Sequence, residues 1–429
     1  MPNVLNTLDQ WLSHISQSHP KEIELGLDRV KSVYQKMSFE ARPRKIVVVA
    51  GTNGKGSTIA LSQAGLASQG LRCGTYTSPH ISKYNERVQL LGVDASDHQL
   101  VEAFQYIDEV RGDTPLTYFE FGTLAALYVL FNADLDVVLL EIGLGGRLDA
   151  VNIVDADISV ITSIDIDHID WLGDDIQQIG REKAGILRKG QPFLAGENLP
   201  QSVFECAEKL ACQTLVCHED FYIDDDLVSV AQKDLSRFKF QGFPKLNLPD
   251  NNILLAYQLI ALLLDGRSLD ADSVYRSMCN VKLSGRLEQS SQVKGLYFDV
   301  GHNPHAARFL KSFLLKEGEG KDKIEVVFSA LADKDVRGVV AELSESVDRW
   351  LIAPLNVDRA MSIAELQSVL SEVSDKVLSF ETIDQALAFS LEQKEKEISA
   401  MTTGKESLVL VFGSFFTVEA AKKFMDSYE

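Results

Sequence analysis

The sequence has few cysteines, no long hydrophobic run and no excess of positive charge, and each shortage excludes a class of protein. Its five cysteines are odd in number and include no C-x-x-C pair, which argues against a disulfide framework. Cys212, Cys217 and His218 lie close together in the sequence, but their spacing fits no usual zinc site. We therefore expect reduced thiols and a cytoplasmic location.

The other two shortages restrict the partners. No apolar run reaches the roughly 18 residues of a membrane span, and the N-terminus lacks the apolar core of a secretion signal. The net charge is −20 at pH 7, and it argues against a nucleic-acid backbone as ligand because such a ligand needs a basic stripe. We expect small-molecule substrates, no membrane or nucleic-acid partner, and a monomer. A phosphate or carboxylate ligand then requires Lys, Arg and Mg²⁺ concentrated locally.

The length of 429 residues exceeds the size at which one hydrophobic core stops growing, so two domains are expected. Residues 1–44 show helical spacing, and from Lys45 onward strand-like apolar runs alternate with helical patterns. This alternation predicts an α/β fold with parallel strands. The expected strands of the first series are residues 46–49, 73–77, 137–142 and 158–164.

Residues 213–248 interrupt this alternation. They predict short antiparallel strands around residues 221–226, 238–240 and 246–248, and a helix follows over 251–264. A second β/α series then begins, with strands expected at 296–300, 324–328, 350–353, 377–380 and 408–412. We place the domains at residues 1–287 and 288–429.

The most informative stretch is residues 45–57, where a β-branched apolar run enters a turn with three glycines around one lysine. Such a turn lets backbone N–H groups face a phosphate, and the following helix adds partial positive charge. Lys55 would reach the outer phosphates, and a Ser57 or Thr58 hydroxyl would face Mg²⁺. The spacing departs from G-x-x-x-x-G-K-[ST], since Val49 replaces the first glycine. A plain tight β-to-α turn is the alternative.

Polar residues also follow the ends of other predicted strands, where open α/β sheets bind ligands. Glu141 closes a buried run, and a carboxylate there favours a Mg²⁺ ligand or a water-positioning role. Ser78 precedes Pro79 and fits turn chemistry equally well. His168 lies among three aspartates, which leaves a metal-binding and a structural role open. Lys183 reads locally as an exposed lysine near a helix end.

The second half carries three further candidates. Asp299 and the segment from His302 to His305 follow a predicted strand. Asn303 could simply cap the next helix, with Pro304 at its first position. Arg286 would be solvated by default, but a cation near the domain boundary could move onto phosphates.

Together these motifs resemble the Mur ligase superfamily, and within it the folylpolyglutamate synthase/dihydrofolate synthase family. The resemblance covers about residue 20 to the C-terminus, and its motifs occur in family order. They are Ala50-Gly-Thr-Asn-Gly-Lys-Gly-Ser57, Ser78-Pro-His80, Glu141-Ile-Gly-Leu-Gly-Gly-Arg-Leu-Asp-Ala150, Thr162-Ser-Ile164, Asp167-His168, Gly180-Arg-Glu-Lys-Ala-Gly185, Ser284-Gly-Arg286, Phe298-Asp-Val-Gly-His-Asn-Pro304 and Gly413-Ser-Phe415. Only about 45 residues precede the phosphate loop, too few for the extra domain of the superfamily's peptidoglycan-precursor ligases.

The resemblance implies a two-domain Mur-ligase fold, with a P-loop ATPase-type parallel sheet and a small antiparallel element before a Rossmann-like β/α domain. It also implies site residues, with Lys55, Lys183, His168 and Asp299 as catalytic residues. The ATP contacts would be Thr52, Asn53, Gly54, Lys55, Gly56, Ser57, Thr58, Asn252, Arg286 and Asp299, although Asn251 leaves a one-residue ambiguity at Asn252. The metal ligands would be Ser78, Glu141, His168 and Lys183 as a carbamate. The dihydropteroate contacts would be Thr117, Tyr118, Phe119, Glu120, Leu148, Asp149 and Ala150. The cofactors would be ATP and Mg²⁺ at two sites, with room for a monovalent cation.

These implications predict an ATP-dependent ligase that joins L-glutamate to 7,8-dihydropteroate and adds further glutamates to tetrahydrofolate through an acyl phosphate. Glutamate is expected around His302 and Asn303. A folylpolyglutamate synthase with that single activity is the nearest alternative. An ATP-hydrolysing switch or binding protein is an alternative from a different class. A P-loop kinase is disfavoured because it leaves the Gly-Lys-Gly loop and the second β/α domain without a role.

Overall fold

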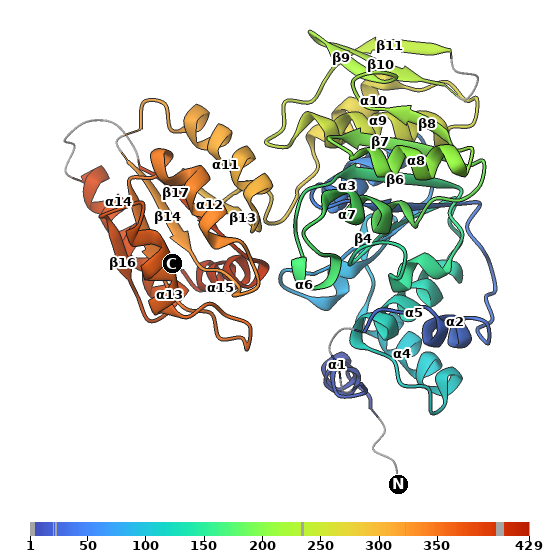
Figure 1. Cartoon of the computed structure of the whole chain (residues 1–429), viewed down its shortest axis with the longest axis horizontal. Coiled ribbons are helices and arrows are strands. Elements are labelled where there is room, and N and C mark those ends of the chain that lie inside the picture. Colours follow the sequence, from blue (N-terminus) through green and yellow to red (C-terminus); the bar gives the residue numbers. More distant parts are fainter. Residues whose placement is uncertain are drawn as a thin grey trace. The chain divides into compact units, whose positions relative to one another are not determined.

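The computed structural model describes residues 5–19, 21, 24–232, 236–321, 323–399 and 407–428. The chain folds into two compact units, each drawn in Figure 1. The first contains residues 1–166 and 172–281, and the second contains residues 167–171 and 282–429. The second unit therefore takes most of its residues from position 282 onward, whereas the sequence placed the boundary after residue 287.

The first unit is built on an eight-stranded sheet. Its spatial order is β4 (Val93–Asp94), β3 (Val88–Leu90), β2 (Cys73–Tyr76), β5 (Val137–Glu141), β1 (Lys45–Ala50), β6 (Ile158–Ser163), β7 (Pro192–Glu197) and β8 (Gln213–Val216). The strands β2, β5, β1, β6, β7 and β8 run parallel to one another. At the β2 edge, β3 and β4 extend the sheet with antiparallel pairing. All four runs predicted for the first series form strands. Their near-continuous burial reflects a parallel sheet covered on both faces.

Helices surround this sheet. They are α1 (Leu8–Ser16), α2 (Asp28–Tyr34), α3 (Lys55–Ser68), α4 (Asp97–Arg111), α5 (Tyr118–Phe131), α7 (Ile176–Ala184), α8 (Gln201–Lys209), α9 (Asp250–Leu263) and α10 (Ala271–Cys279), with the short helices η1 (Tyr84–Arg87) and η2 (Ala150–Ile153). The helix α6 (Ile169–Leu172) begins in the second unit's segment. Most of α5 and α9 is buried, which explains why both are apolar on nearly every side. The helix α3, which follows the phosphate loop, packs against α9 and α10.

Residues 213–248 required two corrections. The predicted antiparallel element exists as a three-stranded sheet of β11 (Arg237–Gln241), β10 (Leu227–Ala231) and β9 (Tyr222–Asp224). Residues 213–216 do not belong to it, because they form β8 and pair parallel with β7. The strand predicted at 246–248 was wrong. Pro244 and Pro249 lie on either side of it, and proline has no N–H for a sheet ladder.

The second unit carries a six-stranded sheet in the order β12 (Glu288–Gln289), β13 (Leu296–Asp299), β17 (Leu408–Phe412), β14 (Ile324–Phe328), β15 (Arg349–Ile352) and β16 (Val377–Ser379). Only β12 is antiparallel to its neighbour. Trp350, Phe328 and Phe412 form its aromatic core. Its helices are α11 (Pro304–Glu317), α12 (Val336–Leu343), η3 (Ser344–Ser346), α13 (Ile363–Ser371), α14 (Ile383–Ser399) and α15 (Phe415–Asp426). Within the described ranges of the chain, no helix is long and apolar enough to cross a membrane.

Candidate functional site

The glycine-rich turn connects β1 to α3 and has the backbone geometry of a phosphate loop. Gly54 precedes the first residue of α3 with φ of 87°, in the left-handed region that favours glycine. Gly51 packs so closely that a Cβ atom there would lie 2.0 Å from Thr162 Oγ1. Lys55 begins the helix, and its Nζ donates hydrogen bonds to Gly51 O at 3.0 Å and Thr52 O at 3.2 Å. The ammonium therefore lies directly on the loop.

The end of β6 holds this loop in place. Thr162 Oγ1 donates to Asn53 O at 2.6 Å, and Ser163 Oγ donates to the same oxygen at 3.2 Å. The backbone N–H of Thr52 donates to Ser163 O at 2.7 Å. Because β6 pairs directly with β1, the Thr162-Ser motif of the sequence supports the phosphate loop from the neighbouring strand.

The two asparagines at the start of α9 have different surroundings. Asn251 Nδ2 donates to Thr162 O at 2.9 Å, and its Oδ1 accepts the N–H of Glu197 at 3.2 Å. The side chain of Asn252 instead lies on the loop, with Oδ1 only 2.3 Å from the position of a Cβ at Gly54. It is 4% exposed and has no side-chain hydrogen bond within the described residues. Asn251 therefore joins elements of the sheet, and Asn252 is the asparagine that faces the loop.

Three predicted metal ligands lie near this loop. Glu141 ends β5 with 5% exposure, and its Oε2 accepts the N–H of Ser78 at 3.0 Å. The same Oε2 is 3.7 Å from the position of a Cβ at Gly56. Lys183 of α7 is 5% exposed and donates from Nζ to Gly51 O at 3.1 Å. Since Lys55 bonds the same oxygen, the two lysine nitrogens lie within about 6 Å of each other.

This donor set suits a hard cation that shares nucleotide phosphates. No group of three or more His, Cys, Asp or Glu side chains in the described ranges could hold a metal ion by itself. Mg²⁺ commonly uses only one or two carboxylates and takes its remaining ligands from phosphates and water. Glu141 and the Ser78 segment beside the loop fit that pattern. Beside the zinc spacing rejected above, His218 Nε2 pairs with Glu197 Oε1 at 2.6 Å, and burial raises the pKa of Cys217.

The second glycine turn, residues 143–149, lies directly on α7 beside Lys183. A Cβ at Gly146 would lie 2.9 Å from Lys183 Cα, and Arg147 N donates to Glu182 O at 2.8 Å. Asp149 is 3% exposed and accepts the N–H groups of Leu144 and Val151 at 2.8 and 2.9 Å. Burial raises the pKa of Asp149 to about 6, against the lowering effect of these backbone hydrogen bonds. Leu148 and Ala150 flank it at the start of η2.

The other predicted substrate segment, Thr117 to Glu120, begins α5 and meets this turn. A Cβ at Gly143 would lie 2.5 Å from Phe119 Cζ, and the Phe119 ring stacks on Tyr76 with centroids 6.3 Å apart. Thr117 and Glu120 form a capping box, in which each side chain accepts the other residue's backbone N–H. The fold therefore brings the two predicted substrate segments together through the contact of Phe119 with Gly143.

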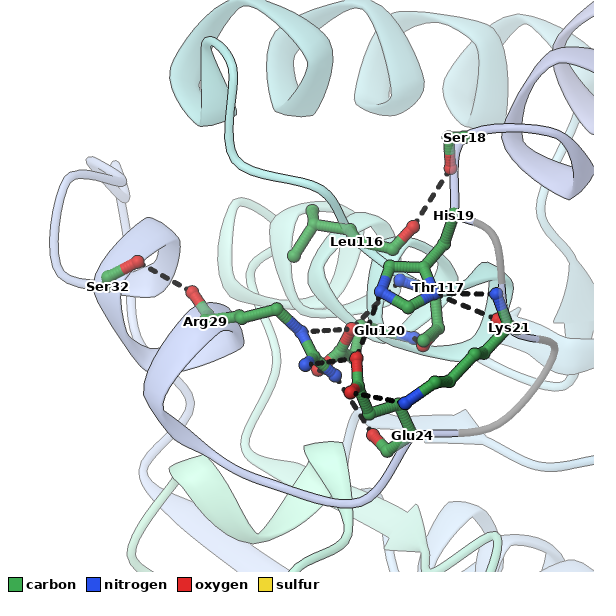
Figure 2. A network of polar contacts seen from close by, with 9 residues as sticks. All are labelled: Ser18, His19, Lys21, Glu24, Arg29, Ser32, Leu116, Thr117 and Glu120. Atoms are coloured by element: carbon green, nitrogen blue, oxygen red, sulfur yellow. Dashed lines mark hydrogen bonds and ion pairs between the residues drawn. The ribbon is translucent and has the colours of Figure 1, made fainter.

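Sequence reasoning missed the partner of Glu120, which is shown in Figure 2. Arg29 Nη2 donates to Glu120 Oε1 at 3.1 Å, and its Nη1 donates to Glu24 Oε2 at 2.6 Å. Ser18 Oγ also donates to Leu116 O at 2.9 Å. The N-terminal segment is thus tied to the start of α5. The available signal was Glu120 itself, since a carboxylate in a segment this apolar is costly unless it is paired or hydrogen-bonded.

The second unit holds the remaining predicted residues. Asp299 ends β13, 8% exposed, and accepts the N–H groups of Leu287 and Gly301 at 2.9 and 2.7 Å. Burial raises the pKa of Asp299, although the nearby Arg286 charge opposes this shift. Arg286 lies 5.3 Å from the centroid of the Phe415 ring.

Asn303 and His302 contact Asp167, which belongs to the same unit. Asn303 Oδ1 accepts the N–H of Ala306, which confirms its helix-capping role, and its Nδ2 donates to Asp167 Oδ2 at 3.0 Å. His302 Nε2 lies 3.5 Å from that oxygen, and Lys334 Nζ donates to Asp167 Oδ1 at 2.7 Å. Burial opposes the ionisation of Asp167, but His302 and Lys334 together lower its pKa. His168 follows with φ of 55°, and its N–H donates to Asp167 Oδ1 at 2.7 Å. The sequence did not single out Lys334.

Comparison with known proteins gives consistent matches. Residues 49–195 match the Mur ligase middle domain, and residues 285–415 match the Mur ligase glutamate ligase domain. The dihydrofolate synthase/folylpolyglutamate synthase of Haemophilus influenzae is 38% identical over 96% of both chains. A solved structure of Escherichia coli FolC in complex with DHPP and ADP is 34% identical, with a TM-score of 0.88, over 100% of this chain and 99% of that one. A bifunctional folylpolyglutamate synthase/dihydrofolate synthase with Mn, AMPPNP and L-glutamate bound is 37% identical over 99% of both chains, with a TM-score of 0.87.

Proposed function

The chain belongs to the dihydrofolate synthase/folylpolyglutamate synthase family of Mur ligases, and from that membership we propose that it is an ATP-dependent, ADP-forming glutamate ligase. Its proposed reactions join L-glutamate to 7,8-dihydropteroate and add further glutamates to tetrahydrofolate. The observation that carries this proposal is the convergence of Lys55 and Lys183 on Gly51 O beside Glu141. The Phe119 segment lies on the neighbouring glycine turn.

The reaction follows from the limits of the substrate. A carboxylate is a poor electrophile, so ATP first phosphorylates it to an acyl phosphate and leaves as ADP. Lys55 and the loop N–H groups stabilise the charge of the transferred γ-phosphoryl. The α-amine of glutamate then attacks the acyl carbon, an amide bond forms, and phosphate leaves with the former carboxylate oxygen. The protein forms no covalent bond to the substrate and works by positioning and charge.

The assignment of individual residues is part of this proposal. The proposed Mg²⁺ ligands are Ser78, Glu141, His168 and Lys183 as a carbamate. The ion would offset the charge of the phosphates. The proposed ATP contacts are residues 52–58, Asn252, Arg286 and Asp299. The segments 117–120 and 148–150 are proposed to hold the pteroate, and His302 and Asn303 the glutamate. The proposal also includes two Mg²⁺ ions, a monovalent cation, a monomeric state and a cytoplasmic location.

One assay tests the function. Purified full-length protein is supplied with ATP, Mg²⁺ and L-glutamate, and ADP release is followed with dihydropteroate, with tetrahydrofolate or with no acceptor. We expect ADP release that requires glutamate and an acceptor, with the glutamylated product identified by mass spectrometry. Lys55→Ala should lower its rate about 10²–10³-fold. Lys45→Ala is the matched control, since Lys45 is an exposed lysine that pairs with Asp157. ADP release without glutamate or acceptor would favour the switch, and turnover of tetrahydrofolate alone would favour the single activity.

A further inference from the structure

Arg87 occupies the same edge of the first sheet as the phosphate loop. It ends η1 and immediately precedes β3, and its carbonyl accepts the N–H of Thr77 at 2.8 Å. Because β3 pairs antiparallel with β2, its first residue lies beside the carboxyl end of β2. The order along this edge is therefore the phosphate loop after β1, Glu141 on β5, Ser78 after β2, and then Arg87.

The environment of Arg87 is unusual for a cation. The residue is 8% exposed, and its guanidinium carbon lies 5.2 Å from the Tyr84 ring centroid and 5.7 Å from that of Tyr118. Its Nε donates to His80 Nδ1 at 2.8 Å. Among the described residues no carboxylate pairs with Arg87, and its two terminal nitrogens have no hydrogen-bond partner.

The positive charge of Arg87 is only partly offset by the groups around it. A buried charge is costly unless it is paired, and two tyrosine faces offset only part of that cost. His80 cannot supply the missing anion. Its Nδ1 accepts a hydrogen bond from Arg87 Nε–H, which can only donate, so Nδ1 carries no proton in this contact. The two terminal N–H groups form a planar fork, which suits a carboxylate.

The position of Arg87 indicates which carboxylate it can reach. Three strand spacings separate β3 from β1, which places its backbone roughly 14 Å from the phosphate loop along the sheet. The carboxylate that receives the phosphoryl group must lie at that loop beside Lys55. Arg87 instead stacks on Tyr118, in the segment proposed to hold the acceptor. Its partner is therefore a group of the acceptor other than the carboxyl that receives the phosphoryl group.

We propose that Arg87 binds the α-carboxylate of the glutamyl residue already present on a folate acceptor. This inference rests on the proposed function. Dihydropteroate has no such carboxylate, because its single carboxyl is the reacting one. Arg87 would then contribute to the second activity, the extension of glutamylated folates, and much less to the first.

The test compares two acceptors in one enzyme. The ratio of kcat/KM for tetrahydrofolate to kcat/KM for dihydropteroate is measured in wild type, Arg87→Met and Arg87→Lys. We expect the ratio to fall roughly tenfold to a hundredfold in Arg87→Met, the range for losing a charge-assisted hydrogen-bond pair. Arg87→Lys keeps the charge but loses the fork, so its ratio should fall less. Dihydropteroate turnover shows that each variant is folded.

Arg111 provides the matched control. Its guanidinium lies 5.6 Å from the Phe121 ring, but it is paired with Asp108. Arg111→Met should leave the acceptor ratio within about twofold of wild type. A ratio in Arg87→Met equal to that of wild type, including equal loss of both reactions, would overturn the assignment. A wild-type protein that glutamylates neither acceptor would instead refute the proposed function itself.

Discussion

Two adjacent asparagines at the start of α9 give the sharpest prediction, because substitutions one residue apart should affect different properties of the protein, its stability in one case and its ATP binding in the other. Asn251→Ala removes a side chain that bonds two parts of the sheet. Asn252→Ala removes one that faces the phosphate loop without a protein hydrogen bond in the described ranges. We expect Asn251→Ala to lower stability and Asn252→Ala to weaken ATP binding.

The magnitudes follow from these contacts. Asn251→Ala leaves the Thr162 carbonyl and the Glu197 N–H without their partner, and each buried unsatisfied group costs about 1–3 kcal/mol. We therefore expect the free energy of unfolding to fall by about 2–4 kcal/mol. Asn252→Ala breaks no such bond, so its stability should change by less than about 1 kcal/mol. Its KM for ATP should rise roughly two- to tenfold, the value of one lost hydrogen bond.

Urea unfolding without nucleotide measures the first effect, with the m value checked for constancy. Initial rates over a range of ATP concentrations measure the second, at saturating glutamate and dihydropteroate. The reasoning fails if the two results are exchanged, with a destabilised Asn252→Ala of normal KM and a stable Asn251→Ala of raised KM. Such an outcome would place Asn251 at the nucleotide.

Four further predictions concern single residues. Lys55→Ala should lower kcat about 10²–10³-fold, since one transition-state contact is worth on the order of 2.7–4 kcal/mol, and a rate within threefold of wild type would refute the role. Phe119→Ala should raise KM for dihydropteroate while ATP binding stays unchanged, and equal loss of both would mark the segment as structural. Lys183→Ala should be nearly inactive and partly restored by a small added carboxylate, whereas Lys183→Arg should not be restored, because guanidinium stays charged. Burial raises the pKa of Asp149 to about 6 from an ordinary 3.8, so its contribution to stability is complete below about pH 4 and is lost as pH rises through about 6. The stability of wild type relative to Asp149→Asn should therefore fall by about 1 kcal/mol between pH 5 and 7 in urea unfolding, and no such change would contradict the raised pKa.

The predictable part of the fold is the part fixed by local pattern. Apolar runs rich in β-branched residues predicted β1, β5 and β6, because strands buried on both faces are built mainly from apolar residues. The strands β3 and β4 at the sheet edge carry weaker patterns and were not predicted. Residues 246–248 show the opposite failure, since two leucines alternate there as in a strand but lie between two prolines.

The candidate site divides in the same way. The glycine-lysine turn after a buried strand marks the phosphate loop, and the carboxylate at the end of another buried strand marks Glu141, since a buried carboxylate is costly unless it is paired or bound. Pairings across long sequence separations were not predictable. Arg29 reaches Glu120 from 91 positions away, and no local pattern connects them. The roles of Asn251 and Asn252 likewise depend on the rotation of α9 against the sheet, which only the packed structure defines.

The close approach of Lys55 and Lys183 is consistent with a binding site for anions at the phosphate loop. Both ammonium groups donate to Gly51 O, and their nitrogens lie within about 6 Å of each other. Two like charges at that distance repel by on the order of 3 kcal/mol at an effective dielectric constant of about 20. The buried carboxylate of Glu141 lies beside the same loop, and its negative charge offsets part of this repulsion. In the proposed enzyme, a bound triphosphate would reduce the repulsion further by supplying anions, and a carbamate on Lys183 would remove it by converting one cation into a ligand. Both fit the proposed ATP-dependent ligase, in which Lys55 faces the phosphates and Lys183 carries a carbamate.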